Sequence, residues 1–423
     1  MNTEYMKSLL KKRKYKMNDI VAVIGAGPAG LLAAAFAAKK GKKVCLIEKN
    51  KIIGKKLLIT GKGRCNVTNS ASMEDFIANT AVNASFLYSA FYSFTNADIM
   101  ELIENEGVKL KEERGGRVFP VSDRASDVRD ALVSFASKQG VKFLNAEVKA
   151  VDKSDDGFIV KFSDFKKLIA SKVIVATGGV SYPGTGSTGD GYRIAEKFGH
   201  KIIEPKASLV PLVTKEQYVS ELMGLSLKNI AVRLMKNGKE IYSDFGEMLF
   251  THFGLSGPVI LSSSSHIRDD GEYKIEIDLK PALDFKTLDN RILRDFEKEK
   301  NKDFINALDE LLPKKIIPVI VALSGIGERT KVNSITRQQR HDFVNLLKSF
   351  TFTVTGKRPV SEAIITSGGV CVKEINPGTM ESKLCHGLFF AGEVIDVDAY
   401  TGGFNLQIAF STAYLAGNGL DER

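Results

Sequence analysis

The strongest constraint on the fold is a short apolar segment near the start of the chain that runs directly into a glycine-rich turn. Residues 20–24 read Ile-Val-Ala-Val-Ile, a β-branched run typical of a buried parallel strand. Gly25, Gly27 and Gly30 then form Gly-x-Gly-x-x-Gly, and an alanine-rich helix is predicted over 31–40. The first glycine allows a tight turn, the second lets the backbone approach a pyrophosphate, and the third lets the helix pack closely. Phosphates would lie at the helix N-terminus, where free amides favour anions.

A second predicted strand supplies the acid that completes this signature. It covers 43–47 and ends at Glu48, which lies 18 residues beyond Gly30. A carboxylate at this distance is placed to hold a ribose hydroxyl of an adenine dinucleotide. The strand before the turn, the helix after it and the position of the acid favour dinucleotide binding over the alternative of an ordinary tight β–α turn.

Another Gly-x-Gly-x-x-Gly sequence, from Gly184 to Gly189, does not meet the same conditions. Tyr182 and Pro183 precede it in place of an apolar strand, whereas the dinucleotide motif requires that strand. We predict a loop there, followed by a helix over 190–198. The chain is therefore expected to contain one dinucleotide-binding domain.

Changes in periodicity divide the rest of the chain. Short alternating strands, with turn residues such as Asn237-Gly238, predominate over 205–283 and are typical of a small antiparallel barrel. Helical patterns follow over 284–349. The predicted fold class is α/β: a Rossmann-like domain begins with 19–204, β-barrel and helical domains are inserted, and 350–423 returns through the barrel into the first domain.

The net charge of the chain is compatible with two interpretations of its binding partners. The formal net charge is +10, and residues 1–18 form a basic leader in which Met17 is a candidate alternative start. A basic balance is typical of proteins that bind nucleic acid or another polyanion. A lysine-rich enzyme with no such partner would have the same composition.

Cysteine usage and hydropathy predict the compartment and exclude several classes of site. Cys45, Cys65, Cys371 and Cys385 form no CxxC pair and no metal-type cluster. No apolar stretch approaches the ~20 residues that cross a bilayer, and the N-terminal segment lacks the apolar region of a secretory signal. We expect a cytoplasmic protein with reduced thiols, no membrane association and no metal.

A second cofactor signal lies near the end of the chain. Residues 388–393 read Leu-Phe-Phe-Ala-Gly-Glu, and 401–407 read Thr-Gly-Gly-Phe-Asn-Leu-Gln. Glu393, just past a buried strand, is placed to accept a hydrogen bond from the ribityl chain of a flavin. The helix that begins near Gly403 would point its amides at the flavin N1/C2 oxygen, where negative charge gathers on reduction. The alternative is a plain strand–turn–helix unit.

Seven motifs occur in order between about Asp19 and Gly417: VAVIGAGPAG, GKGRCNVTN, GRVFPVSDRASDV, ATGGVSYPGTGSTGDGYRIAEKFGH, THFGLSGP, TMESK and GLFFAGEVIDVDAYTGGFNLQIAFSTAYLAG. Through them the sequence resembles the BaiN/RdsA-like (YhiN-type) NAD(P)/FAD-dependent oxidoreductase family, which includes aminoacetone oxidase-like flavoproteins. The TGDG segment is also similar to that of flavoprotein fumarate reductases. Ala399 stands where some family members have glycine, and the basic leader is outside the family pattern.

The resemblance implies a three-part architecture, with an FAD domain formed by both ends of the chain and barrel and helical domains inserted between them. It also implies the residues that hold the FAD, which come from six separate segments. They are Gly25, Ala26, Gly27, Pro28, Ala29, Gly30, Glu48, Lys49, Gly61, Gly63, Arg64, Cys65, Asn66, Val148, Ala176, Thr177, Gly178, Gly392, Glu393, Gly403, Phe404, Asn405 and Leu406.

Two residues are candidates for a proton donor, because the flavin itself performs hydride transfer and the protein supplies the proton. Cys65 belongs to a loop expected to reach the flavin ring, and the alternative is a small residue packed beside it. His252, in THFGLSGP, is the second candidate, and the alternative is a histidine that shapes the pocket. Arg64 and Arg117 are candidates to bind an anionic substrate or phosphate, or to form structural ion pairs.

The family resemblance implies an FAD oxidoreductase that moves a hydride through flavin N5, with reduction of an activated C=C bond as the first reading. Uridine in 23S ribosomal RNA is slightly favoured as substrate, ahead of an unsaturated small molecule such as an enone or steroid intermediate. An aminoacetone-type amine oxidase that uses oxygen is one alternative. A flavin-containing RNA-binding factor with structural FAD is another. NADH or NADPH is a candidate transient reductant, and the sequence predicts no oligomeric state.

Overall fold

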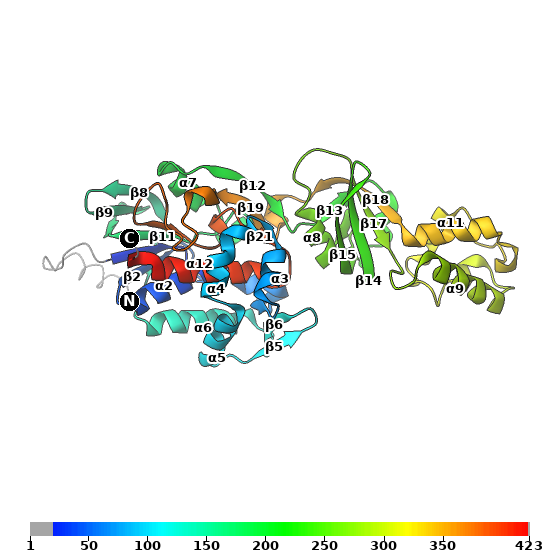
Figure 1. Cartoon of the computed structure of the whole chain (residues 1–423), viewed down its shortest axis with the longest axis horizontal. Helices are drawn as coiled ribbons and strands as arrows, with labels where there is room; N and C mark the ends of the chain where they lie inside the picture. The colour runs from blue at the N-terminus through cyan, green and yellow to red at the C-terminus, as the bar shows by residue number, and fades with distance from the viewer. Residues whose placement is uncertain (1–19, 422–423) are drawn as a thin grey trace. The chain divides into compact units, whose positions relative to one another are not determined.

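The computed structural model describes residues 20–421, so the predicted basic leader lies outside the described residues (Figure 1). The chain forms two compact units. The first unit contains residues 20–207 and 360–421, and the second unit contains residues 208–359. Both ends of the described chain therefore belong to the first unit.

A five-stranded sheet in the order β20-β11-β1-β2-β7 forms the centre of the first unit. All of its neighbouring strands run parallel, as the β-branched, apolar sequences predict. Residue Ile24 of β1 pairs with Val175 on one side and Ile47 on the other. The strands are β1 (Ile20–Ile24), β2 (Lys43–Glu48), β7 (Lys142–Asn145), β11 (Lys172–Val175) and β20 (Leu388–Phe390).

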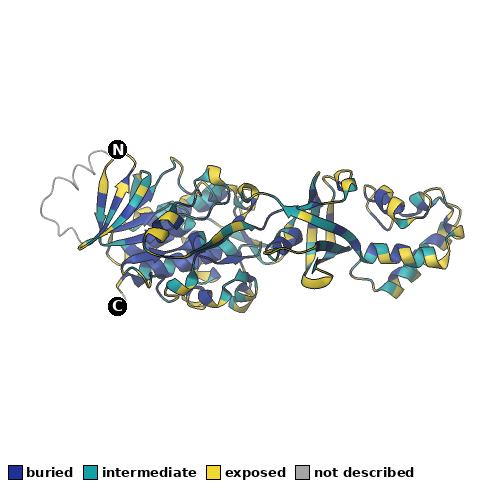
Figure 2. Ribbon diagram, turned by 90° about the horizontal axis from the view of Figure 1, so that it is seen from above, coloured by how far each residue is buried: buried dark blue, intermediate teal, exposed yellow. Residues whose placement is uncertain are grey.

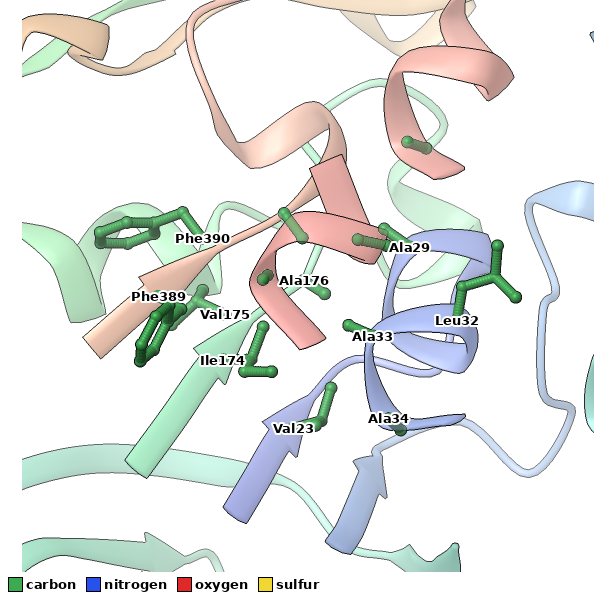
Figure 3. Packing of buried hydrophobic residues seen from close by; sticks show 14 of the residues in the cluster. Val23, Ala29, Leu32, Ala33, Ala34, Ile174, Val175, Ala176, Phe389 and Phe390 are labelled. Carbon is green, nitrogen blue, oxygen red and sulfur yellow. The ribbon is translucent and has the colours of Figure 1, made fainter. Parts of the chain in front are cut away.

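Two apolar helices, α2 (Pro28–Lys39) and α12 (Phe404–Asn418), pack against each other beside this sheet. Small residues permit the close approach: a Cβ at Gly417 of α12 would lie 2.6 Å from the carbonyl oxygen of Ala33 in α2. Figure 3 shows the alanines of α2, including Ala33, close to Val23 of β1. Burial of α2 along residues 29–37 explains why its sequence carries almost no polar side chains.

Smaller sheets and helices complete the first unit. The additional strands are β3 (Thr68–Asn69), β4 (Thr80–Val82), β5 (Leu110–Glu113), β6 (Arg117–Pro120), β8 (Val148–Ser154), β9 (Gly157–Phe162), β10 (Lys167–Ala170), β12 (Ile202–Ser208), β19 (Ile365–Val370) and β21 (Asp398–Ala399). The additional helices are α3 (Met73–Ala78), α4 (Tyr88–Ser93), α5 (Asn96–Asn105), α6 (Ala125–Lys138) and α7 (Asp190–Lys197). The segment 184–189 is a loop and short 3₁₀ turn leading into α7, as predicted.

One prediction of local structure was wrong in this unit. The apolar pattern of residues 73–105 predicts helix throughout, but this segment contains β4, which pairs with β21 near the other end of the chain. Local periodicity carries no information about a pairing partner more than 300 residues away. Here pairing with that distant strand outweighs the local preference for helix.

The second unit contains a closed barrel in the order β13-β16-β15-β14-β17-β18. Its strands are β13 (Leu212–Thr214), β14 (Ser226–Lys236), β15 (Lys239–Phe250), β16 (Gly254–Ser256), β17 (Tyr273–Asp278) and β18 (Phe350–Lys357). Asn237 and Gly238 both have positive φ in the β14–β15 turn, as an Asn-Gly hairpin requires. Along β17, buried residues alternate with residues of intermediate exposure, and Figure 2 colours the chain by these classes.

Two details of the barrel differ from the prediction. The alternating pattern predicts separate short strands at 240–242 and 248–251. The structure has one continuous strand there, β15, because pairing with β14 continues through the polar residues between them. The same pattern predicts one strand over 208–214, whereas in the structure β12 ends at Ser208 and β13 begins at Leu212.

Four helices accompany the barrel: α8 (Pro258–Ser264), α9 (Phe285–Lys298), α10 (Ile317–Ser324) and α11 (Arg337–Lys348). The buried faces of α9, α10 and α11 share one hydrophobic cluster with the barrel, joined by residues such as Ile277 and Leu347. The barrel and helices therefore form one unit in this structure, whereas their periodicities differ in the sequence.

Neither a membrane span nor a metal cluster is found within the described range. Among residues 20–421, no helix has the length and apolar character needed to cross a bilayer. The same residues contain no group of three histidine, cysteine or acidic side chains arranged to hold a metal ion.

Candidate functional site: a cofactor cradle at the edge of the parallel sheet

The glycine-rich turn lies at the carboxyl end of β1, where parallel sheets bind ligands. The amide of Gly25 donates to the carbonyl of Ile47 at 2.8 Å. A Cβ at Gly25, whose φ is +99°, would lie 2.5 Å from the carbonyl oxygen of Ala176, and one at Gly30 would overlap the carbonyl oxygen of Gly25. A Cβ at Gly27 would meet no described atom within 4 Å. Of the three glycines in this turn, Gly27 alone borders open space, as a pyrophosphate requires.

Glu48 holds this turn in place. One carboxylate oxygen accepts from the amide of Ala26 at 2.8 Å, and the other accepts from the amide and side chain of Asn50 at 2.8 and 2.9 Å. The amide of Ala146 donates to the carbonyl of Glu48, so the connection leading to Val148 crosses the end of β2. Glu48 and Val148 both lie at the expected edge of the sheet. Contact of Glu48 with the ribose of FAD and contact of the Val148 backbone with FAD remain predictions.

Glu393 is the centre of a hydrogen-bond network that sequence reasoning missed. Its carboxylate accepts from Lys56 Nζ at 2.7 and 3.0 Å, from Ser181 Oγ at 3.1 Å, and from the Thr366 amide at 2.9 Å. The Lys56 and Glu393 side chains are each 21% exposed. Lys56 lies 337 residues from its partner, and no spacing in the sequence indicates the pairing. The network ties four segments together beside Gly178.

The N-terminus of α12 forms a second amide-rich edge. Gly403 precedes the helix with φ of +104°, and a Cβ there would overlap the backbone of Thr68. The Asn405 side chain accepts from the Ala399 amide at 2.9 Å and donates to its carbonyl at 2.7 Å. Phe404 is buried against Phe76. Backbone groups of 403–406, rather than the side chains of Phe404 and Asn405, are therefore left to contact a cofactor.

The loop 60–66 has an unusual backbone. Gly61, Lys62, Gly63 and Cys65 all have positive φ, a conformation that costs non-glycine residues roughly 1–3 kcal/mol each and clusters at functional sites. Such conformations persist only where surrounding contacts hold them. The amide of Cys65 donates to the carbonyl of Thr60 at 3.0 Å, which closes the loop.

Arg64 anchors this loop through ion pairs with two acidic residues. Its guanidinium donates to both Glu113 oxygens at 2.8 and 3.1 Å and to Asp123 at 3.1 Å, and it lies 4.0 Å from the centre of the Phe119 ring. The hydrogen bond from Arg64 lowers the pKa of the Glu113 carboxyl. Arg64 therefore forms the structural ion pairs that were one of its two predicted roles, and its contact with a substrate or cofactor remains a prediction.

Three further predicted residues have defined places. Lys49 donates to Thr188 and Asp190, both at 2.6 Å, and ties β2 to α7. Arg117 donates to the carbonyl of Arg114 at 3.0 Å. A Cβ at Gly392, whose φ is +76°, would lie 2.8 Å from Ala29 Cβ, which places these two segments side by side.

The residues at this edge fit FAD. Asn66 Oδ1 and Thr177 Oγ1 are buried and have no hydrogen-bond partner among the described residues, although buried polar atoms are nearly always satisfied. The first turns of α2 and α12 contain no acidic residue, so both helix N-termini are electrostatically suited to anionic groups. Together with the open space at Gly27, these features match a dinucleotide bound along the sheet edge.

Cys65 does not have the environment of a proton donor. It is 0% exposed and belongs to the main hydrophobic cluster of the first unit. Burial raises the pKa of its thiol to about 12. The structure therefore supports the packing alternative and not the catalytic one.

We expect Cys65→Ala to retain turnover within about twofold, because a packing residue contributes little to the transition state. The free energy of unfolding should fall by about 1 kcal/mol, since a buried side chain is shortened. Steady-state kinetics and urea unfolding of the flavin-loaded protein measure the two effects. A hundredfold loss of turnover with unchanged flavin content would restore the catalytic assignment.

His252, the other donor candidate, lies in the second unit on the turn between β15 and β16, and its ring is exposed. It contacts the neighbouring Phe253 edge-on, with ring centres 4.9 Å apart. Unlike Cys65, it is exposed, and its catalytic role remains a prediction.

Comparison with known proteins identifies the family. The sequence matches the HI0933-like protein Rossmann domain over residues 19–419. It is 35% identical to a ribosomal RNA dihydrouridine synthase of Haemophilus influenzae, covering 93% of this chain and 96% of the relative. It is 31% identical to a 3-dehydro-bile acid delta(4,6)-reductase of Clostridium scindens, covering 95% and 99%. This chain belongs to the HI0933-like family and is an FAD-dependent oxidoreductase, which confirms the predicted class.

Solved structures confirm the fold class. The open conformation of a flavocytochrome c3 fumarate reductase matches with a TM-score of 0.50 at 18% identity, covering 99% of this chain and 81% of that one. A 3-ketosteroid-delta4-(5alpha)-dehydrogenase from Rhodococcus jostii RHA1 matches with a TM-score of 0.50 at 13% identity, covering 97% of both chains. The predicted α/β architecture with a Rossmann-like domain and an inserted barrel is present.

Proposed function

We propose that this protein reduces an activated C=C bond, and that its substrate is a uridine of ribosomal RNA. The observation that carries the proposal is similarity along almost the whole chain to two proteins named ribosomal RNA dihydrouridine synthase, at 35% and 33% identity. The bile acid reductase is 31% identical over a similar length. Both names describe saturation of a conjugated C=C bond, so the reaction type is supported more broadly than the substrate.

The residues at the sheet edge have defined tasks in such a reaction. When bound, FAD supplies hydride transfer at its N5. The turn at 25–30 and the N-terminus of α2 would hold the pyrophosphate, and Glu48 would orient the adenosine part. The network of Lys56 and Glu393 would fix the loops beside the flavin, and the amides at 403–406 would stabilise negative charge at its N1/C2 oxygen.

A proton must reach the substrate carbon next to the one that receives the hydride. We propose His252 for this step, because it is exposed and histidine is the side chain that most often serves as a general acid. NADH or NADPH is the proposed reductant, acting transiently. The cytoplasm, where both ribosomal RNA and this reductant occur, is the proposed location.

The test of this function separates the two half-reactions. The flavin-loaded protein is first reduced anaerobically with NADH or NADPH. Its reoxidation is then followed separately with unmodified 23S ribosomal RNA fragments, an enone, aminoacetone and oxygen. Reoxidation by RNA with formation of dihydrouridine is the expected result. Reoxidation by the enone or oxygen, with RNA inert, would contradict the RNA assignment and indicate a small-molecule enzyme.

We expect His252→Gln to slow reoxidation by the substrate on the order of a hundredfold, the typical contribution of general acid catalysis. The rate of flavin reduction by NADPH should not change, since that step needs no proton from this residue. Stopped-flow absorbance measures both rates. His386→Gln, at an exposed histidine paired with Glu381 in the first unit, is the matched control. Equal reoxidation rates in wild type and His252→Gln would exclude His252 as the donor.

A further inference from the structure

A pocket of about 310 Å³ lies within the second unit, and none of the residues discussed above as candidate site residues lines it. The start of β14, the two residues that follow β17 and the residues before α10 form its walls. Apolar side chains of Leu227, Ile230, Leu279, Leu312 and Ile316 line most of it. Pro313, polar Ser226 and two lysines, Lys228 and Lys280, complete the lining. Its volume is at the lower end of the range for small-molecule sites.

Lys280 has no counter-ion in this pocket. Its ammonium makes no hydrogen bond or ion pair with any residue between 20 and 421. Asp278, two residues earlier, pairs with Lys348 at 2.5 Å, and its other oxygen accepts from the backbone amide of Lys280. Burial and the positive charge of nearby Arg291 lower the pKa of Lys280.

This arrangement is unfavourable for the isolated protein. A half-buried ammonium without an anion loses part of its hydration, and no ion pair or hydrogen bond compensates for that loss. Buried charges in proteins are normally paired. A methionine would fill the same space among the apolar side chains without that cost. The missing anion is therefore the feature of the pocket that needs an explanation.

We propose that the pocket binds a small amphipathic anion, with its charged group on Lys280 and its apolar body against Leu227, Ile230, Leu312 and Ile316. Lys228, which is exposed, lies at the same site and adds positive charge. The lining contains no aromatic ring, so the stacking surface on which single-stranded nucleic acid relies is absent from these residues. An aliphatic carboxylate has the required chemistry.

The experiment uses the flavin-loaded full chain and equilibrium dialysis with radiolabelled decanoate as the probe. Decanol, which has the same chain and no charge, is the matched ligand. Lys280→Met removes the ammonium, and Lys286→Met, at an exposed lysine of α9 that does not line the pocket, is the matched variant. The chain has no tryptophan, so binding is measured directly and not by intrinsic tryptophan fluorescence.

We expect wild type and Lys286→Met to bind decanoate at least tenfold more tightly than decanol, and Lys280→Met to lose this preference. The melting temperature of Lys280→Met should equal or exceed that of wild type, because an unpaired charge is removed. Equal affinity for the two ligands, no binding at millimolar decanoate, or a marked loss of stability in Lys280→Met would overturn the proposal. Displacement of decanoate by short RNA in proportion to RNA binding would also overturn it and assign the pocket to nucleic acid.

Discussion

Replacing Gly27 by alanine should abolish tight FAD binding while leaving the protein folded. The added Cβ projects into space that no described atom occupies within 4 Å, and this is the space where the pyrophosphate must approach the backbone. We expect the affinity for FAD to fall about a hundredfold, or about 2.8 kcal/mol. The free energy of unfolding of the apoprotein should fall by less than about 1 kcal/mol, the difference between glycine and alanine at a helix N-cap.

Titration of apoprotein with FAD, followed by flavin fluorescence, measures the affinity, and urea unfolding measures the stability. Gly184→Ala is a matched control, because a Cβ there also meets no described atom within 4 Å. Gly184 lies in the second Gly-x-Gly-x-x-Gly sequence, which we predict does not bind the cofactor. Equal loss of FAD in Gly27→Ala and Gly184→Ala would contradict the proposal that the turn at 25–30 binds the pyrophosphate. Gly30→Ala should lose both flavin and stability, since its Cβ would overlap the carbonyl oxygen of Gly25.

Replacing Glu393 by glutamine should destabilise the protein and weaken FAD binding together. The glutamine still accepts from the Thr366 amide but leaves the Lys56 ammonium without its carboxylate. Breaking a fully buried pair costs about 3–5 kcal/mol; because both side chains are 21% exposed, we expect about 2 kcal/mol here. Urea unfolding and the ratio of flavin to protein after purification measure the two losses.

A double-mutant cycle identifies the cause. Lys56→Met combined with Glu393→Gln should recover about 1–2 kcal/mol relative to the sum of the single losses, because neither charge is then left alone. Asp421→Asn provides a control nearer the surface: its pair with Lys42 has side chains that are 62% and 31% exposed, and it should contribute at most about 1 kcal/mol. Additive losses for Lys56 and Glu393 would show that the network is not coupled and that each residue acts separately.

The sequence predicted those parts of the cradle that depend on neighbouring residues. The strand, turn and helix from Ile20 to Lys39, the Glu48 end of β2 and the Asn237-Gly238 hairpin follow from local backbone requirements. Glycine can adopt positive φ, and β-branched runs favour strands. The position of Glu48 depends only on where its own strand ends. The order of the barrel and helical segments also follows from a change of period along the chain.

Only the tertiary structure determined which distant charged side chains pair with each other and which thiol is buried. The environments of Cys65 and Arg64 are set by segments that fold around them, so the sequence could propose a donor and an anion site but could not show that Cys65 is buried or that Arg64 pairs with Glu113 and Asp123. The partner of Glu393 is Lys56, and Lys280 has none among the described residues. The sequence determined which local units form. Which ionisable groups meet, and which are left in apolar surroundings, depended on packing between segments hundreds of residues apart, because desolvation and ion pairing act through space.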